Sequence, residues 1–260
     1  MTAYLRQVWG LRYFWMALVR SDLRSRYRRS MIGVGWSLLH PIAMTIVLCT
    51  VFSQLFHADV RSYGPFLLAG LVTWNFIASV MNQGCQCFFQ GESYIRQYPA
   101  PLAIYPLRTV LGAGIHFLLG MAVVVMFVWA VQGLGNLPVL PTLLPTLLLL
   151  FVFGWSLAVC VGVINVMFQD TQHLTEILLQ ILFYMTPIIY SADLLRERHL
   201  AWFIRLNPLA SFMELVRQPV LEGRVPNAQA FTMAGTAALL AAVAATVMLS
   251  RLERRFIFYL

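Results

Sequence analysis

The sequence predicts an all-α integral membrane protein. We expect six transmembrane helices, an N-terminal amphipathic helix at the interface, a short cytoplasmic helix, and outer re-entrant helices between spans five and six. Of the 260 residues, 60% are hydrophobic and 11% are charged, and the mean hydropathy is +0.75. A soluble domain carries about 25% charged residues, so most of this chain is expected to lie in lipid.

Six segments contain enough consecutive apolar residues to cross a bilayer, each bounded by charge, proline or glycine. They cover residues 36–56, 65–86, 108–131, 142–167, 173–190 and 229–250. The fifth segment is short and carries Glu176 and Gln180, so we expect it to begin at the membrane interface.

The distribution of arginine predicts the orientation. Residues 1–35 contain seven arginines and one acid, whereas residues 132–141 carry no charge. The positive-inside rule therefore places the N-terminus in the cytoplasm. An even number of spans returns the arginine-rich tail, residues 251–260, to the same side. Because this charge lies beside membrane spans, anionic lipid or an acidic partner is a better match for it than nucleic acid.

The first 18 residues have one apolar helical face. Its members recur at steps of three and four and are Tyr4, Val8, Leu11, Trp15 and Leu18. A helix with this pattern lies in the headgroup plane. The arginines that follow it anchor the cytoplasmic end of the first span.

Two segments that connect spans have sequence patterns typical of short helices. Residues 90–98 are compatible with a short cytoplasmic helix closed by prolines, or with a proline-bent connector. On the outer side, Asn207 followed by Pro208 is a helix start, and Gly223 is a stop. That helix is too short to span the membrane, and both a re-entrant and a surface position remain open.

Motifs for nucleotide binding and for hydrolysis are absent from the sequence. It contains no G-x-x-x-x-G-K-[ST], no H-E-x-x-H and no G-x-S-x-G, so we expect no P-loop ATP site and no catalytic centre. Asp170, His173 and Glu176 are spaced by three and could gather a metal ion, but Asp170 is better explained as a helix N-cap. We therefore expect no metal site and no cofactor in this chain.

The order and spacing of these features resemble the permease subunit of ABC-2 type polysaccharide exporters, which move lipid-linked O-antigen, capsule or teichoic acid chains. The most specific stretches are RYRRSMIGVGWSLLHP at 26–41 and FQDTQHLTEILLQILFYMTPIIY at 168–190. One departure is Gln169, where the family pattern usually has arginine. The resemblance covers residues 1–260 as one transmembrane domain, with a cytoplasmic interfacial segment (1–35), six spans (36–250) and a cytoplasmic tail (251–260).

The resemblance implies a transport subunit of the bacterial inner membrane rather than an enzyme. Two permease copies would pair with two ATP-binding subunits, which carry ATP and Mg²⁺, and the partners can include periplasmic export components. An ABC-2 drug or lipid exporter is the first alternative function. A membrane-embedded transferase acting on lipid-linked substrates is the second, although the sequence offers few acids or bases for it.

The resemblance also suggests four groups of site residues. Contact with the ATPase would be made by Glu92, Ser93, Tyr94, Ile95, Arg96, Gln97 and Tyr98. The lipid pyrophosphate would meet Arg24, Arg28 and Arg29, since guanidinium groups bind phosphate oxygens bidentately. Aromatic faces for the glycan would be Trp36, Phe52, Phe56, Phe183, Tyr184 and Tyr190, with Phe183 and Tyr190 on one face of span five. The outer gate would contain Asn207, Pro208, Phe212, Glu214 and Arg217.

Overall fold

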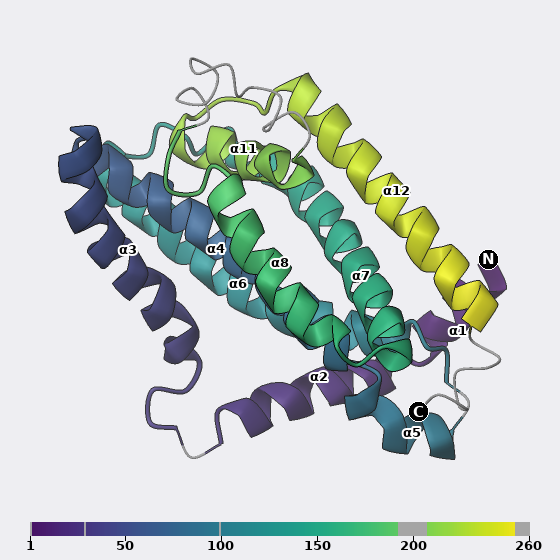
Figure 1. Ribbon diagram of the computed structural model, residues 1–260. Helices are drawn as coiled ribbons and strands as arrows, with labels where there is room; N and C mark the ends of the chain where they lie inside the picture. The colour runs from purple at the N-terminus through teal and green to yellow at the C-terminus, as the bar shows by residue number, and fades with distance from the viewer. Residues whose placement is uncertain (1, 29, 99, 192–206, 253–260) are drawn as a thin grey trace.

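The computed structural model describes residues 2–28, 30–98, 100–191 and 207–252, and these residues form helices and no strand. The long helices run between two ends of the molecule (Figure 1), which we name the α5 end and the α11 end after the helices that lie there. In chain order the α-helices are α1 (Thr2–Gly10), α2 (Arg12–Arg26), α3 (Trp36–Phe56), α4 (Val60–Gln86), α5 (Glu92–Gln97), α6 (Ile104–Gln132), α7 (Leu143–Met167), α8 (Thr171–Met185), α11 (Pro208–Leu221) and α12 (Ala228–Leu252).

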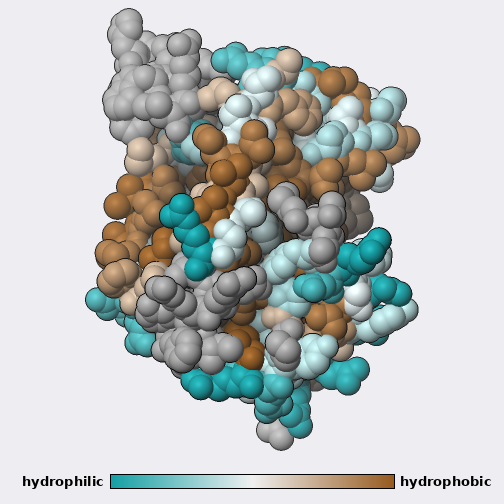
Figure 2. Space-filling model, turned by 90° about the vertical axis from the view of Figure 1, so that its right-hand side faces the viewer, coloured by the Kyte–Doolittle hydropathy of each residue, from teal (hydrophilic) through white to brown (hydrophobic). Residues whose placement is uncertain are grey.

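Five helices in the described part of the chain are long and apolar enough to cross a membrane. They are α3, α4, α6, the helical segment Leu140–Met167 that contains α7, and α12, and they correspond to five of the six expected spans. Figure 2 shows the face on the α12 side, where hydrophobic side chains cover much of the surface and hydrophilic ones gather at the lower, α5 end.

The helix in the fifth expected span ends earlier than the predicted range, 173–190. Helix α8 has 15 residues, which at 1.5 Å per residue make about 22 Å, short of the roughly 30 Å of a bilayer core. It ends because Thr186 adopts an extended conformation, with ψ at 138°, immediately before Pro187. Proline disfavours helical geometry in the residue before it.

Helix α4 is the centre of the fold. Of its most apolar 18-residue window, 78% is buried, compared with 22% for α3 and for α12. The main core packs its inner face against α6, α7, α11 and α12, through side chains such as Phe76, Phe117, Phe153 and Phe212.

Glycines bring α4 and α7 into backbone contact near the α5 end. A Cβ added to Gly84 would lie 2.8 Å from the Cα of Ala158, and one added to Gly162 would lie 2.7 Å from the carbonyl oxygen of Gly84. Only glycine allows this close approach of two helix backbones. The two helices are thus locked together at one crossing point.

The N-terminal helix is observed as two helices, α1 and α2, separated at Leu11. The hydroxyl of Tyr4 accepts a hydrogen bond from the amide of Ala103 (3.3 Å), and Asp22 forms an ion pair with Arg108 on α6. Tyr4 and Val8 of the predicted apolar face also pack against a buried cluster, and Leu18 is buried, so this face helps to hold α1 and α2 across the α5 end of the bundle (Figure 1).

Candidate functional site

The short helix expected at residues 90–98 is present as α5, which begins at Glu92. One side of it is anchored: Ile95 is buried in a cluster with Leu102, Tyr105 and Val166. The other side is exposed and includes Ser93, Tyr94, Arg96, Gln97 and Tyr98. Helix α5 thus presents a fixed polar and aromatic surface at the α5 end of the molecule.

An ion pair and an aromatic contact fix the exposed side chains of α5. Nε of Arg96 donates to Oε1 of Glu92 at 2.8 Å, one helical turn away. The ring of Tyr94 meets Phe14 of α2 edge-on, with 5.7 Å between centroids. Helices α2 and α5 therefore make one continuous surface.

The predicted phosphate-binding arginines lie along the end of α2. Arg24 is in its last turn, and Arg28 follows the helix; both are exposed. Arg29 lies outside the described residues. The structure places these residues on the surface, and it directs a different arginine, Arg26, toward a cavity.

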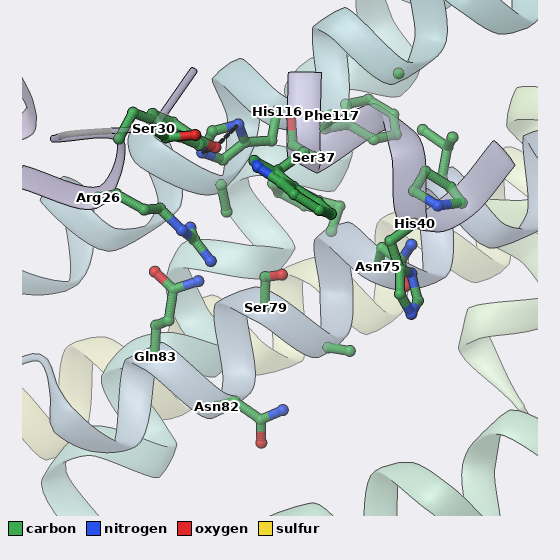
Figure 3. Close-up of a pocket in the computed structure, with 18 residues that line it drawn as sticks. Arg26, Ser30, Ser37, His40, Asn75, Ser79, Asn82, Gln83, His116 and Phe117 are labelled. Carbon is green, nitrogen blue, oxygen red and sulfur yellow. Dashed lines mark hydrogen bonds between the residues drawn. The ribbon is translucent and has the colours of Figure 1, made fainter. Parts of the chain in front are cut away.

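That cavity has a volume of about 720 Å³ and lies between α2, α3, α4 and α6. Figure 3 shows Arg26 extending toward Gln83, with Ser79 and Asn82 nearby on α4. On the opposite wall the hydroxyl of Tyr27 lies 3.3 Å from the ring nitrogens of His116. This polar space inside the helical bundle is lined by Trp36 among the predicted residues.

Sequence reasoning missed this cavity, although a signal was present. Asn75, Ser79 and Asn82, which all line the cavity, follow one another at steps of four and three, which places them on one face of α4. Among the polar residues of the spans, only the ionisable ones were considered as functional candidates, so these uncharged polar residues were not predicted to form a site. The cation that accompanies them, Arg26, was grouped with the topological anchor.

The aromatic residues predicted on α3 lie at both of its ends. Trp36 is 53% exposed at the first residue of the helix. Phe52 and Phe56 stack with 5.7 Å between centroids, and Phe56 meets Tyr63 edge-on. These two rings belong to a small apolar cluster between α3 and α4 near the α11 end.

The aromatic residues predicted around α8 occupy different environments. Phe183 is half-buried and packs edge-on against Trp74 of α4, with 5.5 Å between centroids. Tyr184 is 66% exposed. The hydroxyl of Tyr190 donates to the carbonyl oxygen of Tyr184 at 2.9 Å, which folds the chain after α8 back onto the helix. Because α8 ends at Met185, the prediction that Phe183 and Tyr190 share one helical face is wrong.

Helix α8 also carries an exposed polar stripe. His173, Glu176, Gln180 and Tyr184 recur at steps of three and four and share one face, and all four are exposed. His173 and Glu176 approach each other at 3.9 Å, and Asp170 precedes the helix without a side-chain cap hydrogen bond. No group of three or more metal-ligating residues occurs among the residues that the structure describes.

At the α11 end, Asn207 starts α11 as expected. Its side-chain oxygen accepts from the amide of Leu209 (3.0 Å), its amide nitrogen donates to Thr186 (2.8 Å), and Pro208 occupies the first turn. Phe212 is fully buried and stacks on Phe153 of α7, with 4.8 Å between centroids. The predicted outer residues therefore tie α11 to the chain after α8 and to the core.

Arg217 is the most buried charge in this region. Its guanidinium donates to the carbonyl oxygens of Pro187 (2.6 Å), Ile188 (2.9 Å) and Phe66 (3.2 Å), and it lies 3.6 Å from the centroid of the Phe66 ring. Burial lowers the pKa of Arg217 to about 9, which leaves it protonated at neutral pH. Glu214, also on α11, is half-buried beside a small cavity of about 260 Å³ that Arg217 shares.

Comparison with known proteins adds an independent observation. The sequence profile of the ABC-2 type transporter family matches residues 13–221 of this chain. An O-antigen export system permease protein, RfbA, of Klebsiella pneumoniae is 28% identical over 213 residues, 80% of each chain. RfbA of Myxococcus xanthus is 24% identical over 257 residues, 97% of this chain and 98% of its own. The polysialic acid transport protein KpsM of Escherichia coli is 23% identical over 215 residues, 80% of this chain and 81% of its own.

Proposed function

Because this chain belongs to the ABC-2 type transporter family, we propose that it is the permease subunit of an ATP-driven exporter of a lipid-linked polysaccharide. The substrate would move from the cytoplasmic side across the bacterial inner membrane. The names of its relatives, which refer to O-antigen export and polysialic acid transport, support this substrate class.

The exposed polar stripe of α8 is the observation that carries the proposal. Glu176 and Gln180 lie in a segment flanked by apolar spans, yet they are exposed. Glu176 lies near the interfacial start of α8, but Gln180 and Tyr184 carry the stripe further along the helix, where a polar group without a hydrogen-bond partner costs free energy. The stripe therefore needs water or a second protein copy beside it. A wall that offers polar groups and the ring of Tyr184 fits a hydrophilic polymer better than an apolar drug.

This reasoning supports a homodimer in which α8 of each copy lines the path. In the proposed topology α8 is a sixth, shortened crossing, and the residues up to Tyr190 complete it. The α5 end faces the cytoplasm, which agrees with the arginine-rich segment of α2. Helix α11 and Arg217 then lie at the outer face as part of the gate.

The exposed face of α5 is proposed as the contact with the ATP-binding subunit. The chain has no P-loop motif of its own, so ATP and Mg²⁺ belong to that partner. Since α5 is anchored through Ile95, a movement of the ATPase would be transmitted to the bundle rather than absorbed by a loose loop.

The substrate class is tested with the permease and its ATPase reconstituted in vesicles. A lipid-linked glycan should stimulate ATP hydrolysis and should be translocated in an ATP-dependent way. Stimulation by apolar drugs or by free lipids, without any response to lipid-linked glycans, would contradict the proposed substrate.

The coupling role is tested by exchanging the charges of the ion pair on α5. In the double variant Glu92→Arg and Arg96→Glu the pair persists, but the two charges now oppose the helix dipole, so stability should fall by no more than about 2 kcal/mol. Export and binding of the ATPase should nevertheless be lost. The same exchange at Glu222 and Arg224, an exposed pair at the α11 end, is the control and should leave ATPase binding intact. Normal export by the α5 double variant would refute the coupling role.

A further inference from the structure

A second cavity continues the first one along α3. It has a volume of about 580 Å³ and lies between α3, α4 and α6, on the side of the α11 end. The two cavities adjoin on all three helices. Pro41 and Ile42 are neighbours on α3, while one turn separates Leu68 from Val72 on α4 and Gly120 from Val123 on α6. We name the combined space the α3 groove.

The arrangement of the helices explains why the groove exists. Figure 1 shows α3 and α4 close together near the α11 end and diverging toward the α5 end. Among the five candidate spans, α3 and α12 have the smallest buried share. The groove is therefore a lateral opening of the bundle, and the surrounding lipid phase can reach it.

The end of the groove near α2 is polar and carries a positive charge. Arg26 reaches into it, and no carboxylate lines the described wall. Serine, asparagine, glutamine, tyrosine and histidine side chains supply hydrogen-bonding groups (Figure 3). The side-chain oxygen of Asn82 is buried and has no hydrogen-bond partner among the described residues. A buried acceptor without a partner favours a ligand that offers a hydrogen-bond donor, such as a headgroup hydroxyl.

The other end of the groove is apolar. Its hydroxyl groups at Thr45 and Thr50 donate to carbonyl oxygens of α3 itself, at 2.7 Å each, so they need no further partner. Along α3 this part runs from Ile42 to Gln54, about 18 Å at 1.5 Å per residue. One leaflet of the hydrocarbon core is about 15 Å thick. The apolar end thus has the length of one acyl chain.

A polar, cationic end joined to an apolar channel of one leaflet's length matches one class of molecule. We propose that the α3 groove binds an anionic phospholipid, with its phosphodiester near Arg26, a headgroup hydroxyl donating to Oδ1 of Asn82, and an acyl chain between α3 and α6. A single lining arginine balances the one negative charge of a phosphodiester, whereas a pyrophosphate carries more charge than this wall neutralises. The charge of the site therefore matches a phospholipid better than the pyrophosphate of a carrier lipid. In the proposed topology the lipid comes from the cytoplasmic leaflet.

The test measures lipid that stays bound to the full-length permease. The protein is reconstituted with equal amounts of phosphatidylglycerol and phosphatidylcholine, extracted in mild detergent, and analysed by native mass spectrometry. The wild type should retain phosphatidylglycerol preferentially. Arg26→Gln should lower that retention about tenfold, because it removes a charge-assisted hydrogen bond. Arg20→Gln is the matched control: Arg20 is exposed on the same helix but does not line the groove, and its change should have no effect.

A second pair of variants tests the acyl chain. Thr50→Trp fills the apolar end and should reduce retention of both lipids, whereas Val51→Trp places the same ring on an exposed neighbour outside the groove and should not. Equal retention of the two lipids by the wild type, equal behaviour of Arg26→Gln and Arg20→Gln, or no effect of Thr50→Trp would overturn the proposal. Displacement of phosphatidylglycerol by an equimolar polyprenyl pyrophosphate would also overturn it and would assign the groove to the carrier lipid.

Discussion

Replacing Gly70 by alanine tests whether Arg217 holds the α11 end together. Gly70 lies on α4, directly beside the guanidinium. A Cβ added there would meet Nη2 of Arg217 well inside contact distance and would lie 3.3 Å from the carbonyl oxygen of Ile188. The change therefore acts on Arg217 without altering its charge.

The expected magnitude follows from the hydrogen bonds of Nη2. This nitrogen donates to Phe66 and Ile188, and a hydrogen bond to a charged group contributes about 1.5–3 kcal/mol. Displacing it loses about 3–6 kcal/mol, while alanine in a helix returns about 0.5–1 kcal/mol relative to glycine. We expect the free energy of unfolding to fall by about 2–5 kcal/mol.

The assay is denaturant unfolding in mixed detergent micelles, with Gly235→Ala as the control. A Cβ at Gly235, on α12, meets no atom within 4 Å, so the control should be unchanged or stabilised by up to about 1 kcal/mol. The double variant of Gly70→Ala and Arg217→Met should be no less stable than Arg217→Met alone. If Gly70→Ala were as stable as the wild type, the hydrogen bonds of Arg217 would not stabilise the α11 end as their geometry indicates.

The remaining predictions concern the substrate. Replacing Arg24, Arg28 and Arg29 together by lysine preserves the positive charge but not the bidentate fork. Export should fall severalfold in a vesicle assay, while the membrane topology stays unchanged. Full export by this variant would leave these residues only an anchoring role. Alanine at both Phe183 and Tyr190 should slow the export of long chains more than it lowers ATPase activity, measured by the length distribution of surface polysaccharide. Equal losses in both quantities would argue against an aromatic wall there.

Elements defined by local chemistry could be predicted from the sequence. Asn207 followed by Pro208 predicts a helix start, and the structure shows the Asn207 side chain accepting from the amide of Leu209. Helix α5 lies within the predicted segment for the same reason: prolines follow it, and no proline interrupts it. In both cases the signal and the structure lie within a few residues of each other.

The end of α8 shows where an apolar pattern misleads. Hydrophobic residues continue to Tyr190, so the expected span continued as well. Pro187 was visible in the sequence, and its steric effect on Thr186 ends the helix earlier. Hydropathy predicts that a segment lies in the membrane, but local sterics decide where its helix stops.

Contacts between distant parts of the chain could not be predicted. Asp22 and Arg108 are 86 residues apart and form an ion pair, and either could have been read as an ordinary surface charge. The α3 groove likewise depends on the divergence of α3 from α4. Periodicity along one helix gives the polar face of α4, but it does not reveal which helices stand around that face.

The glycine crossing of α4 and α7 has a mechanical consequence. The backbones of the two helices touch at Gly84 and Gly162, so the helices cannot slide past each other and move as one rigid unit. Near one end α7 shares a cluster with α5 through Val166 and Ile95; near its middle, Phe153 stacks on Phe212 of α11. In the proposed topology, with α5 against the ATPase, a push on α5 would be carried by this rigid pair to α11, while the less buried α3 would take up the displacement.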